Sequence, residues 1–158
     1  MANTQSMCTS FTRELLTGTH NFGVAPIRAA TTADTFKAAL YLTSATLNAS
    51  TTVYSATGEV TGTNYTAGGV TVTNATVPAS TNTSATAGTA YWTPSASITY
   101  TNVTLATAFD TVFIYNSTQS NKAVSVHTFG SQTITAGTFT LTMPTNDTST
   151  ALLRLSTT

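Results

Sequence analysis

Apolar and polar residues alternate along most of this chain, and the alternation has the two-residue period of a β-strand rather than the 3.6-residue period of a helix. In residues 35–43, Phe36 and Leu40 fall on one face of the predicted strand, and Lys37 falls on the other. Segments with the same pattern follow at residues 70–73, 89–93, 98–101, 123–129, 132–135 and 138–143. Turn-forming residues separate these segments, so the pattern predicts an antiparallel protein built from short strands.

One segment is apolar almost without alternation. Residues 109–115 read Phe-Asp-Thr-Val-Phe-Ile-Tyr, which is typical of a central strand that is buried on both faces. We expect this strand to form a hairpin with the next alternating segment, and we expect a second hairpin in which Ala136 and Gly137 make the turn. Phe113 and Leu141 lie within apolar strand segments and are expected to be almost fully buried.

The N-terminal segment has a different period. Phe11 and Leu15 lie four residues apart, so residues 4–18 predict a short helix. Arg13 and Glu14 fall outside the apolar stripe of this helix, and we expect both side chains to face solvent.

The remaining segments complete the expected fold. Residues 78–88 are small and polar, which predicts an exposed loop, and residues 151–155 predict a last strand. About eight strands with turns between them predict an all-β fold, an antiparallel β-sandwich of jelly-roll or Greek-key type with a short N-terminal helix. We expect residues 33–158 to form the single sandwich domain, and residues 1–32 to form the helix and a contact loop.

Charge is nearly absent from the chain. Only 6% of the residues are charged, five basic against five acidic, whereas about 25% is usual; about a quarter are threonine. The charges are scattered singly, so no basic patch predicts nucleic-acid binding. No segment reaches the ~20 apolar residues of a membrane span. The first residues lack the basic and apolar regions of a signal peptide, so we expect a protein that is made and used without Sec-type export.

The residues that an enzyme would need are few. Cys8 and His20 could be a nucleophile and its base, but they lie at opposite ends of the predicted helix and have no evident acidic partner. His127 alternates with apolar residues and is expected to face solvent or an interface. We expect no catalytic activity, no metal and no cofactor. With so few titratable groups, stability is expected to be nearly flat from about pH 5 to 8.

Five segments carry a recognisable pattern. Residues 11–22, 34–41, 65–69, 112–118 and 137–141 read Phe-Thr-Arg-Glu-Leu-Leu-Thr-Gly-Thr-His-Asn-Phe, Asp-Thr-Phe-Lys-Ala-Ala-Leu-Tyr, Tyr-Thr-Ala-Gly-Gly, Val-Phe-Ile-Tyr-Asn-Ser-Thr and Gly-Thr-Phe-Thr-Leu. In these segments the chain resembles a family of small structural proteins of tailed bacteriophages, cyanophages included, and the similarity covers nearly the whole chain. The motifs mark fold and turn positions, and the resemblance implies a structural role in the virion.

Within that role, the resemblance implies a head decoration, or cement, protein. Such a protein would lie on the outer surface of the capsid as a homo-oligomer, expected to be a trimer, and would bind the major capsid protein and clamp neighbouring subunits together. The alternative is a tail-fibre or receptor-binding module, an adhesin, in which a loop rich in threonine, serine and asparagine, with Tyr91 and Trp92 nearby, would face a glycan.

The candidate contact residues lie in two places. One is the loop of residues 23–32, which resembles an insertion relative to shorter family members; the other is the only tryptophan-containing strand. The residues are Val24, Pro26, Ile27, Arg28, Tyr91 and Trp92. Deletion of residues 1–32 is expected to weaken capsid binding and to leave the sandwich folded.

Overall fold

A computed structural model describes residues 2–16, 18–21, 33–73, 78–81, 88–93 and 97–156. Within these ranges the chain is all-β apart from one short helix, as the alternation predicted. The elements are β1 (Ser6–Met7), α1 (Thr9–Leu16), β2 (Phe36–Leu42), β3 (Val70–Thr71), β4 (Ala79–Ser80), β5 (Thr89–Trp92), β6 (Ile98–Asn116), β7 (Lys122–Leu141) and β8 (Leu153–Ser156).

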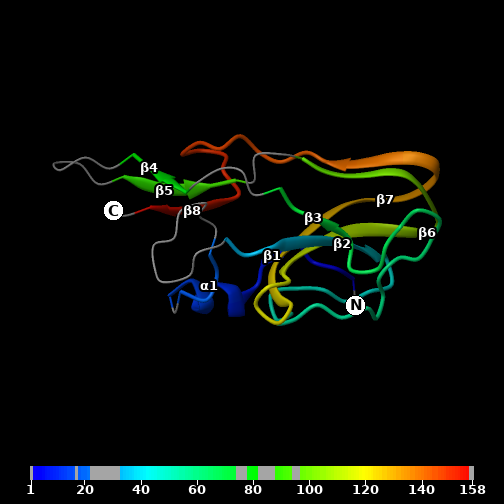
Figure 1. The fold of residues 1–158 in the computed structure, drawn as a ribbon, viewed down its shortest axis with the longest axis horizontal. Helices are drawn as coiled ribbons and strands as arrows, with labels where there is room; N and C mark the ends of the chain where they lie inside the picture. Colours follow the sequence, from blue (N-terminus) through cyan, green and yellow to red (C-terminus); the bar gives the residue numbers. More distant parts are fainter. Residues whose placement is uncertain are drawn as a thin grey trace.

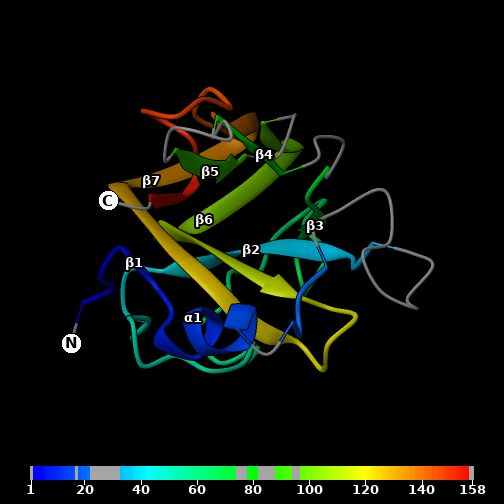
Figure 2. The same cartoon turned by 90° about the vertical axis from the view of Figure 1, so that its left-hand side faces the viewer.

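The strands form two antiparallel sheets that pack as a sandwich. The larger sheet has the order β1-β7-β6-β2-β3, and the smaller sheet has the order β4-β5-β8. The smaller sheet lies at one end of the molecule beside α1 (Figures 1 and 2), and the rings of Phe36 and Trp92, 6.5 Å apart, join the two sheets. The pairing of Ala79 and Ser80 with β5 places a short strand within residues 78–88, where the sequence predicted only a loop.

The centre of the fold is one long, bent hairpin. The sequence predicted four or more short strands here, whereas β6 and β7 run for 19 and 20 residues and pair with each other throughout. Phe129 and Phe139 are ten residues apart, a distance of about 33 Å in a straight strand, yet their ring centroids lie 4.9 Å apart. The hairpin therefore folds over on itself, so the larger sheet is bent and the two halves of the hairpin lie in opposite layers of the molecule (Figure 1).

Ala136 and Gly137 do not make a hairpin turn, in contrast to the prediction. Both residues lie inside β7, where the pairing shifts by one residue between Ile134 and Gly137. Ala136 has a φ of 47°, and its N–H donates to the hydroxyl oxygen of Thr104 at 3.0 Å. This local left-handed residue makes a β-bulge, which bends a strand without reversing it.

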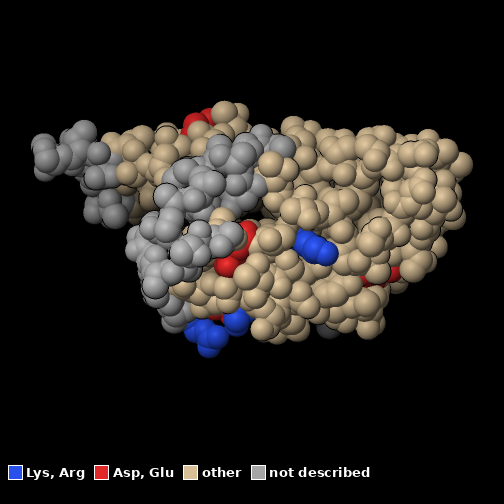
Figure 3. Space-filling view, in the orientation of Figure 1, with Lys and Arg blue, Asp and Glu red and all other residues tan. Residues whose placement is uncertain are grey.

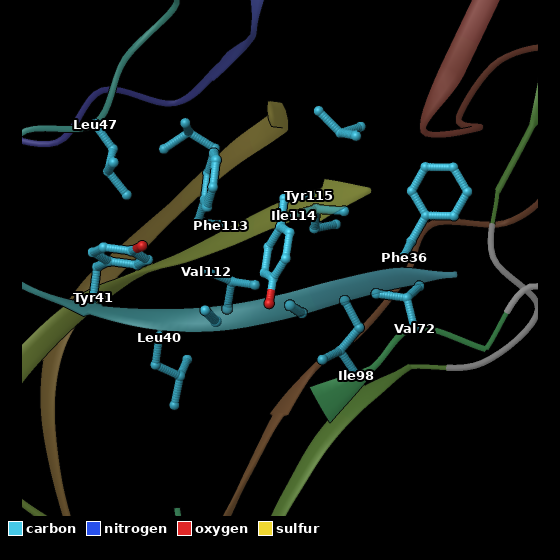
Figure 4. Packing of buried hydrophobic residues seen from close by; sticks show 14 of the residues in the cluster. Phe36, Leu40, Tyr41, Leu47, Val72, Ile98, Val112, Phe113, Ile114 and Tyr115 are labelled. Carbon is cyan, nitrogen blue, oxygen red and sulfur yellow. The ribbon is translucent and has the colours of Figure 1, made fainter. Parts of the chain in front are cut away.

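The core fills the space on both sides of β2. Leu40 and Tyr41 leave β2 in opposite directions (Figure 4), and neither is more than 1% exposed. Phe113 in β6 is 0% exposed, which confirms the prediction for the central strand. Leu141 is only partly buried, contrary to expectation, because it is the last residue of β7 and pairs with the first residue of β6.

The N-terminal segment belongs to the same core. The predicted helix begins later, at Thr9, because Ser6 and Met7 pair with β7. Cys8 and Phe11 are almost fully buried in the main hydrophobic cluster. The described part of residues 1–32 is thus packed into the sandwich that residues 33–158 form.

Candidate interaction surface

A buried polar cluster, made of Glu14, His20, Asp34, Asn116 and Lys122, joins α1 to the turn between β6 and β7. Glu14 is 3% exposed, although the sequence predicted that it would face solvent. It follows Phe11 by three residues, so both side chains lie on the face of α1 that meets the sheet. Its Oε1 accepts a hydrogen bond from the Nζ of Lys122, and its Oε2 lies 2.9 Å from the Nε2 of His20.

The hydrogen bonds of Asn116 determine which ring nitrogen of His20 carries the proton. The Oδ1 of Asn116 accepts the backbone N–H groups two and three residues further on, at 3.1 and 3.2 Å, so its Nδ2 points to the opposite side. That Nδ2 donates to the Nδ1 of His20 at 3.0 Å and to Asp34 at 2.7 Å. A ring nitrogen that accepts a hydrogen bond carries no proton, so the imidazole proton lies on Nε2 and is donated to Glu14. His20 is therefore neutral.

Burial and hydrogen bonds favour a neutral His20 and an ionised Glu14. Burial lowers the pKa of His20, and it outweighs the bond to Glu14, which by itself would raise that pKa. Burial alone would raise the pKa of Glu14, but the hydrogen bonds from Lys122 and His20 outweigh it and lower the pKa. The polar cluster is thus a neutral histidine beside an ionised, lysine-paired carboxylate, and it fastens α1 to the hairpin.

Cys8 is unsuited to act as a nucleophile with His20. Burial raises the pKa of the thiol to about 11, and the charge of Glu14 adds to the effect, so the reactive thiolate is scarce at neutral pH. Both ring nitrogens of His20 are engaged by Glu14 and Asn116. The second histidine, His127, is half-buried beside the hydroxyl of Ser125, and burial lowers its pKa to about 4.

A buried carboxylate outside the polar cluster lies over β2. Glu59 accepts hydrogen bonds from the hydroxyls of Tyr54 and Tyr65, both at 2.6 Å, and from the backbone N–H of Gly68 at 2.8 Å. The carbonyl of Gly68 in turn accepts the hydroxyl of Tyr115 at 2.8 Å. These bonds satisfy a buried carboxylate and hold the connection between β2 and β3 against the sheet, which is a structural role.

Neither cluster is a metal site. In the described part of the chain, no three histidine, cysteine, aspartate or glutamate side chains lie close enough together to hold a metal ion. Among the same residues, no helix has the length and apolar character needed to cross a membrane.

The surface itself offers a candidate contact. An apolar groove of about 650 Å³ lies between α1 and β8. It is lined by Met7, Phe11, Thr12, Leu15 and residues 151–156. Leu155 in this lining is 58% exposed, and Val53 is the other large apolar side chain exposed in the described ranges. Apolar side chains from α1 and from residues 151–155 thus meet at the surface, which makes this groove the candidate contact for another molecule.

The predicted contact residues have different positions. Val24, Pro26, Ile27 and Arg28 lie outside the described residues. Tyr91 is half-buried on β5, so its contact with a partner stays a prediction. Trp92 is 5% exposed and packs beside Phe36, so its indole is occupied by the core of the single chain.

Few charges interrupt the rest of the surface. Most of the face in Figure 3 carries neither basic nor acidic groups. Of the nine charged side chains that the structure describes, three are buried, namely Glu14, Asp34 and Glu59. The described surface is accordingly as poor in charge as the composition suggests.

No protein-family model, curated protein or solved structure matches this chain. The candidate interaction surface is therefore defined by the residues of this chain alone.

The sequence did not predict the groove between α1 and β8, because the two walls of the groove are about 140 residues apart in the sequence. In the sequence, only Leu153 and Leu155 pointed to this groove. They alternate as strand residues do, but the segment before them in the sequence has no strand pattern with which they could pair.

Proposed function

We propose that this chain is a structural protein of a tailed bacteriophage that decorates the outer surface of the head. It binds the major capsid protein, acts as a cement between neighbouring subunits, and associates with further copies of itself. The resemblance of its motifs to small phage structural proteins supports the phage assignment. The protein has no catalytic role in this proposal.

The observation that carries the proposal is a compact β-sandwich whose exposed surface is almost free of charge. A cement protein must lie against many identical neighbours, and each buried charge would have to be desolvated or paired. Hydroxyl groups of threonine can face either water or a partner at a smaller cost. Weak contacts of this kind add up when one oligomer binds several subunits at once.

In the tail-fibre alternative, a loop rich in threonine, serine and asparagine faces a glycan, and Tyr91 and Trp92 lie near it. The burial of Trp92 against Phe36 removes the larger of the two rings from the surface. This placement favours decoration over glycan binding, since stacking on a sugar requires an accessible ring face.

Copy number distinguishes the two functions. We expect quantitative mass spectrometry of purified virions of the encoding phage to find this chain in numbers comparable to the major capsid protein. A copy number as small as that of the tail fibres would support the alternative. Complete absence from purified virions would overturn both.

The groove between α1 and β8 is the expected capsid contact. Leu155→Ser places a hydroxyl in the groove and should weaken binding to purified heads that lack this protein. Val53→Ser is the matched control, because Val53 is similarly exposed, at 48%, but does not line this groove. Equal binding by the two variants would show that the groove is not the contact.

A further inference from the structure

The second half of β7 has an open edge. On its outer side, β1 pairs with Ser125 and Val126 only. From residue 128 to residue 141, β7 pairs with β6 alone among the described residues. The backbone donors and acceptors that point away from β6 in this segment are therefore available to another strand.

This edge has few of the devices that usually protect an edge strand. Natural edges carry lysine or other charges, proline, or bulges. Residues 123–143 contain no charged residue and no proline. The pairing of β7 with β6 shifts between Thr128 and Gln132 and again at Ala136, and residues 137–141 follow as a short run that neither a charge nor a proline protects.

The same run is complementary to itself. Residues 137–141 read Gly-Thr-Phe-Thr-Leu, with Phe139 at the centre and an exposed threonine on each side. When two copies pair antiparallel with Phe139 at the centre, Thr138 of each copy lies opposite Thr140 of the partner subunit, and Thr140 lies opposite Thr138 of the partner subunit. The chain already contains such a pair, since Thr99 and Thr140 face each other across β6 and β7 with their hydroxyl oxygens 3.3 Å apart.

We propose that residues 137–141 of β7 pair with the same residues of a second copy of this chain around a two-fold axis. The pairing joins β6 and β7 of one copy to β7 and β6 of the other in a continuous four-stranded sheet, which satisfies residues 137–141 of the open edge in each copy. The zero net charge of the chain opposes this association very little. The symmetry is two-fold, in place of the trimer expected from the sequence, and it holds whether or not the chain binds a capsid.

Charge placed at the two threonines tests the pairing. In Thr138→Lys/Thr140→Lys, each lysine faces a lysine of the partner, so the dimer dissociation constant should rise about tenfold or more. In Thr138→Lys/Thr140→Glu, each lysine faces a glutamate, and the dimer should persist. Sedimentation equilibrium of the full-length protein measures both constants, and far-UV circular dichroism verifies that the variants are folded.

A mixing experiment makes the test independent of either variant alone. The Lys/Lys variant and a Thr138→Glu/Thr140→Glu variant should each be weakened and should form a mixed dimer when combined. A wild-type protein that stays monomeric at the highest soluble concentration, or that forms trimers, overturns the proposal. So does a Lys/Lys variant that dimerises as tightly as the wild type. None of these outcomes bears on capsid decoration, which is tested with virions.

Discussion

Asparagine has a conformational role at the bends of this chain. Asn64, Asn102 and Asn121 all have positive φ angles, between 52° and 60°. Asparagine enters this left-handed region more readily than most residues because its short side chain bonds locally to the backbone. Asn102 lies where the pairing of β6 shifts, between Tyr100 and Val103. The asparagine content therefore reflects the turns and bulges of the fold.

Truncation of Phe113 tests the core at a single position. Phe113→Ala should lower the free energy of unfolding by about 3–5 kcal/mol, because the ring is fully buried and leaves a cavity. Val53→Ala removes apolar atoms from a side chain that is 48% exposed, and it should cost less than about 1 kcal/mol. Urea denaturation measures both values, and a loss for Phe113→Ala no larger than that of the control would contradict the assigned core.

His20 should make stability depend on pH. The pKa of His20 is lower in the folded chain than in the unfolded chain. Below about pH 6.5 the unfolded state therefore binds a proton that the folded state does not bind. Stability is thus fully present above that pH and falls as the pH drops, by up to about 1.4 kcal/mol per pH unit for one proton. His127, whose pKa burial lowers to about 4, adds to the loss below the same pH, and the lowered pKa of Glu14 continues the loss below about pH 4.5.

The variant His20→Gln separates this contribution from the others. It should be less stable than the wild type at pH 8 and should show a flatter dependence between about pH 5 and 7, as measured by denaturant titration at each pH. A wild-type profile that is flat over this range, as expected from the small number of titratable groups, would contradict the assignment of a neutral, buried His20.

At the scale of elements, close backbone contacts fix the connection from β2 to β3. Gly69 has a φ of 72°, and a Cβ at this position would lie 1.7 Å from the carbonyl oxygen of Ala38 in β2. The next residue, Val70, pairs with that same Ala38. Gly68 beside it bonds to Glu59 and Tyr115. A side chain at residue 69 would push this connection away from the sheet.

Substitution at two glycines tests this contact. Gly69→Ala should cost at least about 1–3 kcal/mol, because it combines a left-handed φ with a backbone clash. Gly130→Ala is the matched control, since nothing lies within 4 Å of a Cβ there, and it should leave stability unchanged or slightly higher. Thermal unfolding compares the two, and equal midpoints would contradict the described turn.

At the scale of the whole molecule, the two layers and the N-terminal segment depend on one another. The bent hairpin supplies strands to both layers, and Tyr100 in one half donates to the carbonyl oxygen of Ala38 at 2.6 Å. The N-terminal segment contributes Cys8 and Phe11 to the core. Glu14 pairs with Lys122, more than 100 residues away. No described part of the N-terminal segment is a separable appendage.

Deletion of residues 1–32 should therefore abolish cooperative unfolding, in contrast to the expectation from the sequence. The loss of Phe11 alone is comparable to a large-to-small core substitution of about 3–5 kcal/mol, and a domain has only about 5–15 kcal/mol in total. A control that lacks only Met1 and Ala2 should unfold as the full chain does. Circular dichroism during heating gives the result, and a truncated chain with a sharp, native-like transition would restore the separate contact segment.

The sequence by itself determined the class of structure. Two-residue alternation in residues 35–43 and the apolar run of residues 109–115 predicted β2 and the C-terminal part of β6, because side chains of a strand point alternately to its two faces. That β2 is buried on both faces was not evident from the alternation. The hairpin that follows Asn116 was predicted on the same basis. The low charge content was also evident without any structure.

Only the tertiary structure decided how these strands join and what they cover. Ala136 and Gly137 have the composition of a turn, yet pairing with β6 on both sides converts them into a bulge within one strand. Glu14 has the pattern of a solvent-facing residue, yet Lys122, His20 and the core beneath α1 make its burial favourable. The second half of β7 has an open edge because β1 pairs only with the first half, and no other described strand pairs with that side of β7. Each of these outcomes depends on contacts between distant residues, and local propensity and periodicity carry no information about such contacts.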